Sequence, residues 1–176
     1  KVTRVVLPNS ITSMDNDAFQ MCYDLTTINI PSGITQLSQM MFSVTKLRNV
    51  YIDDLAAWCS ITFNGPILEG LEENTTKSAL YVQGNRVSEI TIPQSVSKIP
   101  RYAFMFDNLK CIHLHDGVTK IGACAFDHAG LEEFTMPNSV ASLGSYVFSS
   151  CVNLTSLTLS TSLKTLPSGI VFECSS

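Results

Sequence analysis

Residues Val87–Asn108, VSEITIPQSVSKIPRYAFMFDN, carry the pattern that decides the fold of this 176-residue chain. Counted from Val87, aliphatic side chains occupy positions 1, 4, 6, 10 and 13, proline occupies position 7, and phenylalanine occupies position 18. The same template returns every 22 or 23 residues, in stretches that begin at Val2, Leu25, Leu109, Leu131 and Leu154. A period of this length predicts stacked units, each too small to bury its own apolar face.

The first half of each unit alternates apolar and polar residues, as in TINI (27–30) and EITI (89–92). This alternation is typical of a β-strand with one buried face. Positions 4 and 6 of the template then point inward, and positions 3 and 5 point outward. We expect the strands to stack as a parallel sheet, and the proline that follows position 6 to end each strand.

The second half of each unit brings the chain round the other side of the core. An apolar pair such as Val96 and Ile99 is followed by an Ala-Phe pair, for which we expect a short helical or turn segment. The phenylalanines of this phase should form an internal ladder of Phe19, Phe42, Phe104, Phe126 and Phe148, with Phe172 displaced by one residue. A buried aromatic side chain contributes about 1.5–3 kcal/mol by transfer from water, so this ladder would hold neighbouring units together.

The template covers most of the chain, and we therefore predict one solenoid over residues 1–176. Its regular repeats span residues 2–24, 25–46, 87–108, 109–130, 131–153 and 154–176. Because the first and last residues already belong to repeats, we expect the chain to be a segment of a longer protein.

Residues 47–86 are interpreted as a degenerate repeat with an insertion, since the template fails after Ile52. Two aspartates followed by LAAWC (55–59) predict an N-capped helical turn, and residues 60–63 predict a short strand. Further on, residues 79–82 and 87–90 predict a β-hairpin around a central Gly-Asn pair, Gly84 and Asn85, which can adopt positive φ angles.

The insertion has two interpretations. In the first it is a scaffold element that buries Trp58. In the second its loop contacts a partner, because loops on rigid scaffolds often carry binding residues. The polar residues of that loop are Glu69, Glu72, Glu73 and Asn74.

Composition limits the partners. The chain has 15 acidic and 11 basic residues, a net charge of -4, and no run of Lys or Arg. Nucleic acid and anionic membranes need such basic clusters, so neither is expected as a partner. No apolar stretch approaches the roughly 20 residues of a spanning helix, and membrane contact is expected only through an anchor outside this segment.

The six cysteines form no evident framework. Cys151 and Cys174 occupy the same phase of adjacent repeats, which makes a disulfide between them geometrically possible, whereas buried free thiols are the favoured alternative. No C-x-x-C pair suggests a zinc site. His113 and His115 should both face outward from one strand, but two histidines without a third placed ligand predict no metal.

No serine or cysteine nucleophile sits in a recognisable catalytic pattern, and phosphate-binding glycine loops are absent from the sequence. We therefore expect neither enzymatic activity nor a cofactor. The outward positions are mostly polar and neutral, which suits contact with an extended protein segment and equally suits a solvated sheet.

The repeats resemble the BspA-type leucine-rich repeats, whose units read L-x-x-I-x-I-P-x-x-V-x-x-I-x-x-x-A-F. Residues 87–108 and 25–46 are close matches, and the resemblance covers nearly the whole chain. It implies a β-rich leucine-rich-repeat solenoid with a curved parallel sheet and short helical turns. It also implies a bacterial cell-surface or secreted protein, since several similar proteins are adhesins that bind host matrix proteins.

We therefore expect a non-enzymatic protein-interaction module, extracellular or at the cell surface, with a host extracellular-matrix or surface protein as one possible ligand. The alternatives are a carbohydrate-binding surface and a structural spacer, and a polysaccharide-active β-helix enzyme is the weakest hypothesis because the outward positions lack clustered carboxylates. The candidate ligand-binding residues are Asn49, Tyr51, Trp58, Thr91, His113 and Thr135.

Overall fold

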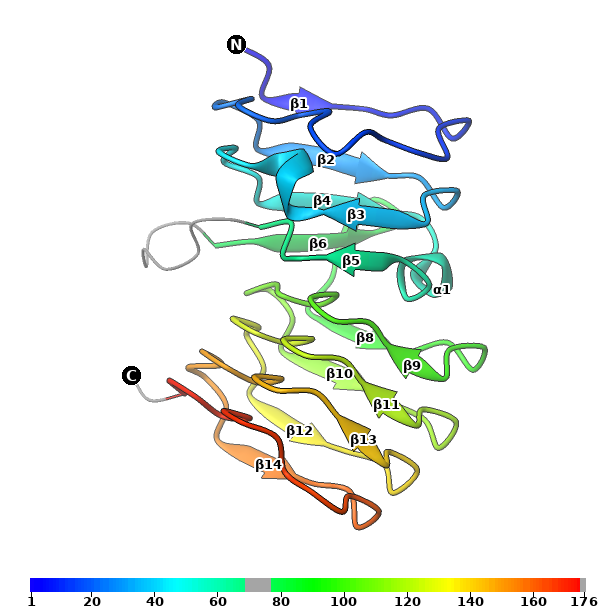
Figure 1. The fold of residues 1–176 in the computed structure, drawn as a ribbon, viewed down its shortest axis with the longest axis vertical. Coiled ribbons are helices and arrows are strands. Elements are labelled where there is room, and N and C mark those ends of the chain that lie inside the picture. The colour runs from blue at the N-terminus through cyan, green and yellow to red at the C-terminus, as the bar shows by residue number, and fades with distance from the viewer. Residues whose placement is uncertain (69–76, 175–176) are drawn as a thin grey trace. The chain divides into compact units, whose positions relative to one another are not determined.

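The computed structural model describes residues 1–68 and 77–174 and divides into two compact units, Lys1–Val87 and Ser88–Ser176. Each unit is a β-solenoid of stacked turns built mainly from short parallel strands (Figure 1). The prediction of one solenoid domain over the whole chain stays a prediction. The acidic loop residues Glu69, Glu72, Glu73 and Asn74 lie outside the described residues.

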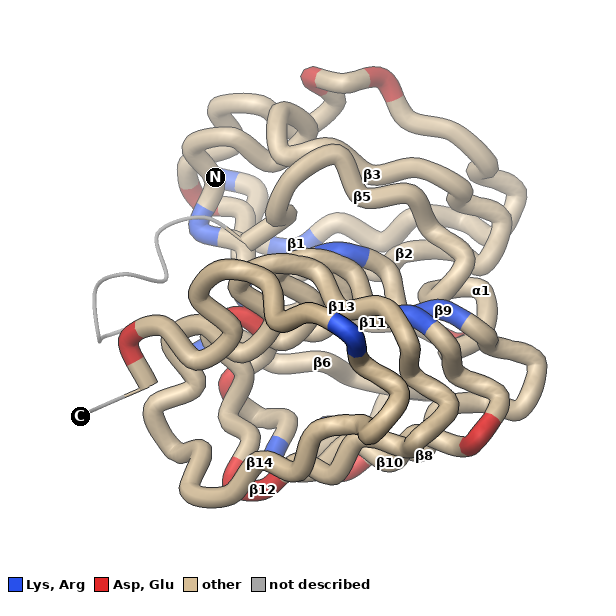
Figure 2. Tube along the Cα trace, turned by 60° about the horizontal axis from the view of Figure 1, so that its bottom comes forward, with Lys and Arg blue, Asp and Glu red and all other residues tan. Residues whose placement is uncertain are grey.

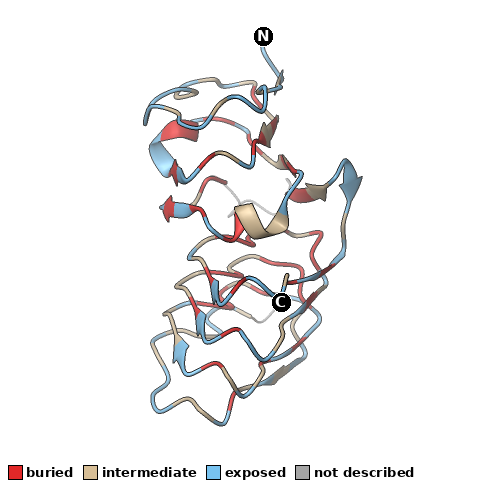
Figure 3. Cartoon of the chain, turned by 90° about the vertical axis from the view of Figure 1, so that its right-hand side faces the viewer, coloured by how far each residue is buried: buried red, intermediate tan, exposed pale blue. Residues whose placement is uncertain are grey.

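The first unit contains a five-stranded sheet. Its parallel strands are β1 (Arg4–Val5), β2 (Thr27–Ile30), β4 (Asn49–Ile52) and β6 (Ala79–Val82), and β7 (Asn85–Arg86) joins β6 antiparallel. The predicted strand position is confirmed, because Ile28, Val50 and Leu80 are each fully buried while their neighbours along the strand are more exposed (Figure 3).

The second unit repeats this arrangement. Strand β8 (Glu89–Thr91) pairs parallel with β10 (Cys111–His113), and β12 (Glu133–Thr135) pairs parallel with β14 (Ser156–Thr158). Paired residues lie 22 or 23 positions apart in the sequence, as Glu89 with Cys111 and Glu133 with Ser156 do. The sequence period is therefore the strand register.

Short parallel strands also form on the opposite side of each core, where the sequence predicted only a returning chain. In the first unit β3 (Gln36–Ser38) pairs with β5 (Thr62–Asn64), and a 3₁₀ helix, η1 (Gln39–Phe42), follows β3. In the second unit the strands are β9 (Lys98–Ile99), β11 (Lys120–Ile121) and β13 (Ser142–Leu143). Each unit thus has two layers of strands around an apolar interior.

The helical turn predicted at the start of the insertion is present as α1 (Leu55–Trp58). Asp54 caps it, because its Oδ1 accepts hydrogen bonds from the backbone N–H groups of Ala56 at 2.8 Å and Ala57 at 3.0 Å. The strand predicted at residues 60–63 is β5, which begins at Thr62. The interruption is therefore built into both strand layers, since β5 lies in one and β6 in the other.

The hairpin after β6 is present, but its predicted position is wrong by one residue. The turn residues are Gln83 and Gly84, with φ angles of 51° and 79°, and Tyr81 pairs with Arg86 across it. Two consecutive positive φ angles are what a two-residue hairpin turn requires. Residues 87–90 do not pair with β6; Glu89 and Ile90 instead begin β8 of the next unit.

The phenylalanine ladder forms inside both units. Phe126 stacks on Phe104 at a ring-centroid distance of 6.1 Å and on Phe148 at 5.4 Å, and all three side chains are fully buried. Phe134 packs against Phe126 and Phe148 from the strand side, a contribution that the ladder prediction missed. In the first unit Phe19 stacks on Phe42 at 5.8 Å.

The prediction for Phe172 is wrong, because this side chain is 51% exposed and meets the edge of Tyr146 instead of continuing the ladder. The Ala-Phe segments are turns without a helix. Their backbones are tied across turns, since Phe104 N–H donates to Ala125 O at 2.8 Å and Phe126 N–H donates to Val147 O at 3.0 Å.

A left-handed backbone recurs two residues after the ladder phenylalanine. Met21, Val44, His128 and Ser150 hold φ angles between 53° and 61°, although none of them is glycine. This conformation costs L-residues about 1–2 kcal/mol, and it is least favourable for a β-branched side chain such as Val44. The bonds between turns hold these residues there, as Met21 N–H donating to Ser43 O at 2.9 Å illustrates.

Replacing Phe126 by Ala should lower the free energy of unfolding by about 3–5 kcal/mol, because it leaves a cavity between two ladder rings. Replacing the exposed Phe172 by Ala is the control and should cost less than about 1 kcal/mol. Chemical denaturation of the three proteins measures both. Similar losses for the two variants would contradict the ladder.

Replacing Val44 by Gly should raise the free energy of unfolding by about 0.5–1 kcal/mol, because glycine adopts the left-handed backbone without steric cost. Val152 is as exposed as Val44, at 52% against 51%, but has no positive φ. The Val152→Gly control should therefore lose about 0.5–1 kcal/mol by the entropic cost of glycine. Equal losses in both denaturation curves would show that the left-handed position carries no strain.

Candidate functional site

The outward face of the first unit is a set of columns that run across β1, β2, β4 and β6. Arg4, Thr27 and Asn49 succeed one another in register, and Asn49 Nδ2 donates to Thr27 Oγ1 at 3.3 Å. In the next column Asn29 bonds the backbone of Leu7, donating to its carbonyl at 2.9 Å and accepting from its N–H at 2.6 Å. These polar side chains are largely engaged in supporting the sheet.

Tyr51 continues the second column and stacks on Tyr81 of β6. Their ring centroids are 4.1 Å apart with an interplanar angle of 11°, and the Arg4 guanidinium lies over the Tyr51 ring at 5.6 Å. Burial raises the pKa of Tyr51, with further contributions from Tyr81, and Arg4 opposes the shift. The three side chains form a neutral aromatic pair with a cation beside it, which we call the tyrosine platform.

Sequence reasoning placed Tyr51 on this face but missed Tyr81. The reason is spacing, because Asn49 pairs with Ala79, which lies 30 residues later instead of 22. The signal was nevertheless present in ALYV (79–82), which has the inward-outward alternation of the other strands.

The inclusion of Trp58 among the ligand-binding residues is wrong. Its side chain is only 2% exposed and packs edge-on against Phe63 at a ring-centroid distance of 5.1 Å. Trp58 therefore fills the core below α1 and offers no ring to a partner, which agrees with the scaffold interpretation of the insertion.

The outward face of the second unit carries the remaining candidates. Thr91 pairs with His113 in adjacent strands, and Thr135 pairs with Thr158. An open groove of about 380 Å³ runs between β10 and β12, and among the residues that line it are Cys111, His113, Glu133 and Thr135. The structure thus places His113 and Thr135 at one groove.

His113 has two close polar neighbours. Its Nε2 atom lies 2.6 Å from Glu89 Oε1 and 3.4 Å from Cys111 Sγ. Burial raises the pKa of the Cys111 thiol, and the carboxylates of Glu89 and Glu133 raise it further. The sequence considered His113 only with His115, and it missed the grouping with Cys111 and Glu89.

His115 does not share this face in the way predicted. Its Nδ1 accepts a hydrogen bond from Gly117 N–H at 3.0 Å, and its Nε2 lies 3.0 Å from the Pro93 carbonyl. One nitrogen accepts and the other donates, which is the arrangement of a neutral imidazole. His115 therefore holds the turn after β10 and is not a partner of His113.

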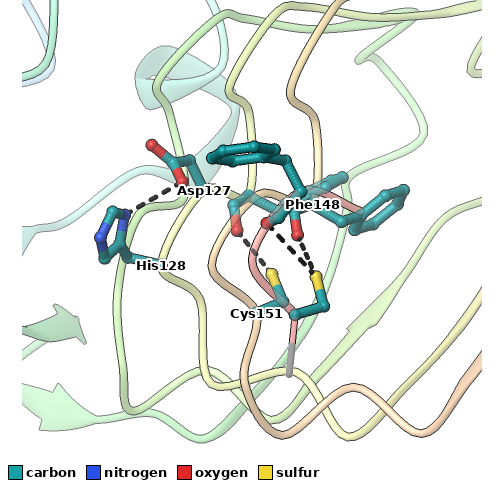
Figure 4. A network of polar contacts seen from close by, with 7 residues as sticks. Asp127, His128, Phe148 and Cys151 are labelled. Carbon is teal, nitrogen blue, oxygen red and sulfur yellow. Dashed lines mark hydrogen bonds and ion pairs between the residues drawn. The ribbon is translucent and has the colours of Figure 1, made fainter. Parts of the chain in front are cut away.

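All six cysteines are free thiols. Cys151 Sγ donates to Phe126 O at 3.0 Å and Cys174 Sγ donates to Phe148 O at 2.9 Å, so that each thiol bonds the preceding turn (Figure 4). The disulfide between Cys151 and Cys174, left open by the sequence, is not formed. Burial raises the pKa of the Cys151 thiol and raises that of Cys59 to about 12, which makes both unreactive.

Asp127 and His128 form an ion pair beside this thiol column, with 3.0 Å between Asp127 Oδ1 and His128 Nδ1 (Figure 4). Acidic and basic side chains are otherwise interspersed along both units (Figure 2). Within residues 1–68 and 77–174, no helix is long and apolar enough to cross a membrane.

The stacked parallel strands, the aromatic ladder and the 22-residue register define a repeat solenoid. A family model described as "BspA type Leucine rich repeat region" matches residues 1–66 and 74–176 in six copies. The chain belongs to this family of leucine-rich-repeat proteins, as the repeat template implied.

Crystal structures of bacterial proteins share the fold. A leucine-rich repeat protein from Eubacterium ventriosum has a TM-score of 0.59 and 20% identity, with 98% of this chain and 57% of that chain covered. One from Bacteroides ovatus has a TM-score of 0.53 and 17% identity, with coverages of 98% and 53%.

The pneumococcal vaccine antigen PcpA is also similar, with a TM-score of 0.52, 18% identity, and coverages of 99% and 55%. The chain therefore spans little more than half the length of these proteins. No curated protein matches it.

Proposed function

We propose that this chain is a non-enzymatic protein-binding segment of a bacterial cell-surface or secreted protein, and that its ligand contacts the outward sheet face. A host extracellular-matrix protein is the ligand class we favour. Support for an external location comes from the family resemblance and from PcpA, a protein of the same fold that is described as a vaccine antigen.

The tyrosine platform is the observation that carries this proposal. Tyrosine and arginine are enriched among the residues that dominate protein–protein binding energy. Tyr51 and Tyr81 stand on adjacent strands whose backbones are hydrogen-bonded in register, so little side-chain and backbone freedom remains to be lost when a partner binds. Asn49 lies two residues before Tyr51 on the same face and can contribute polar contacts.

The platform favours a protein over a carbohydrate. A sugar ring usually packs on the free face of an aromatic side chain. Tyr81 covers one face of Tyr51 from β6, and Arg4 approaches the ring from the β1 side of the sheet. The hydroxyl-bearing edges, which can donate and accept hydrogen bonds to a peptide, are what the pair presents.

Thr91, His113 and Thr135 present polar side chains from the second unit, and their contact with a ligand remains a prediction. The residues of the platform all come from the first unit, so its contribution is testable independently.

The test measures binding of the protein to immobilised extracellular-matrix proteins and to a glycan array. A Tyr51→Ala/Tyr81→Ala double variant should bind the recognised protein about 30-fold or more weakly, because loss of a dominant interface residue costs about 2 kcal/mol or more. A Tyr23→Ala/Tyr146→Ala double variant is the matched control, since these tyrosines are 58% and 42% exposed and do not belong to the platform. It should bind as the native protein does.

Circular dichroism and denaturation establish that both double variants remain folded. Equal binding by the native protein and the Tyr51/Tyr81 variant would overturn the placement of the ligand. Binding to glycans alone would favour the carbohydrate alternative. Failure of the native protein to bind any member of either panel would leave the segment as a spacer.

A further inference from the structure

We propose that Glu89, Cys111 and His113 form a binding site for a divalent transition-metal ion of the zinc class on the outward sheet face of the second unit. The ligand atoms would be one carboxylate oxygen of Glu89, the Cys111 sulfur and Nε2 of His113. These three atoms all lie within 4.8 Å of one another. Metal binding at this site requires no partner, so the inference stands apart from the proposed function.

The strand register brings the three residues together. Glu89 on β8 pairs directly with Cys111 on β10, and His113 lies two residues after Cys111 on the same strand. Residues two apart on a strand share a face, so the imidazole and the thiol project to the same side. Both strands are short segments of a hydrogen-bonded sheet, which fixes the backbone positions of all three ligands.

The distances suit a tetrahedral ion. Zn–S bonds of about 2.3 Å and Zn–N bonds of about 2.0–2.1 Å place the two ligand atoms about 3.5 Å apart in tetrahedral geometry. The Cys111 Sγ to His113 Nε2 distance is 3.4 Å. Glu89 Oε1 lies closer to Nε2, at 2.6 Å, because it shares a proton with the imidazole. An ion that replaced this proton would separate the two atoms to about 3.4 Å, a shift that the exposed Glu89 side chain can make.

The kinds of ligand select the metal. A thiolate and an imidazole favour zinc and neighbouring transition metals, whereas calcium and magnesium prefer sites made only of oxygen ligands. Three protein ligands leave one tetrahedral position open. The groove between β10 and β12, which Cys111, His113 and Glu133 line, gives water or a partner's side chain access to that position.

The electrostatic surroundings also favour a cation. Glu89 approaches Cys111 from β8 and Glu133 from β12, while His113 lies on the thiol's own strand. The carboxylates hold the Cys111 thiol in its protonated form, so an ion must displace that proton when it binds. Affinity should therefore increase as the pH rises from 6 to 8.

Titration with Co²⁺ followed by absorbance tests the site in the folded protein. A cobalt–thiolate bond gives a near-ultraviolet charge-transfer band, which we expect in the native protein and in a Cys22→Ser control, and which Zn²⁺ should abolish by competition. Cys111→Ser should eliminate the band, and His113→Gln should weaken Co²⁺ binding at least about tenfold. Circular dichroism of each variant shows that the fold is retained.

Thiol protection gives a second measurement. Iodoacetamide labelling with peptide mapping should show that Zn²⁺ slows alkylation of Cys111 in the native protein and has no effect on Cys22. In His113→Gln the protection should be lost at the same Zn²⁺ concentration. Absence of the cobalt band, a band that persists in Cys111→Ser, or Zn²⁺ protection that is equal at both cysteines would overturn the site and leave Glu89 and His113 as an ion pair only.

Discussion

Backbone hydrogen bonding between successive turns is the constraint on which the rest of this structure depends. A single turn has strands of only two to four residues and cannot satisfy its own peptide groups. Each turn therefore bonds the next at the sheet, at the opposite strand layer and at the ladder turn; examples are Thr26 N–H to Thr3 O, Gly122 N–H to Ile99 O and Phe126 N–H to Val147 O, at 2.9, 2.9 and 3.0 Å. Bonding at several places around the turn keeps the repeat at 22 or 23 residues, because a change in length at one place would misalign the others.

Once the register is fixed, every template position becomes a column of side chains. Inward columns give the phenylalanine ladder, and outward columns place residues distant in sequence beside one another. The stacking of Tyr51 on Tyr81 and the approach of Glu89 to Cys111 and His113 both follow from strand pairing. A binding surface on such a scaffold is thus written into one or two positions of the repeat, and its side chains are held by a framework that needs no loop to order them.

The inward half of this arrangement was predictable from sequence, because burial imposes a strong preference for aliphatic and aromatic residues at fixed positions. The capping role of Asp54 was predictable for a similarly local reason. The left-handed backbone at Val44 and His128 was not, since it is imposed by bonds between turns on residues with no preference for it. Tyr81 and the Glu89–Cys111–His113 cluster were missed because outward positions tolerate many residue types. Trp58 was misassigned because an aromatic residue in an insertion can equally be core or contact.

Amide hydrogen exchange tests the central claim directly, because it measures bonds between turns individually. The ladder-turn amides of Phe104 and Phe126, each bonded to the following turn, should exchange at least about a hundredfold more slowly than in the unfolded chain, which corresponds to about 2.8 kcal/mol of opening free energy. Protection of these turn amides together with the strand amides of β8 and β10 is the predicted result. Turn amides that exchange at unfolded-chain rates while the strands remain protected would show that the sheet alone sets the register, and would contradict the account.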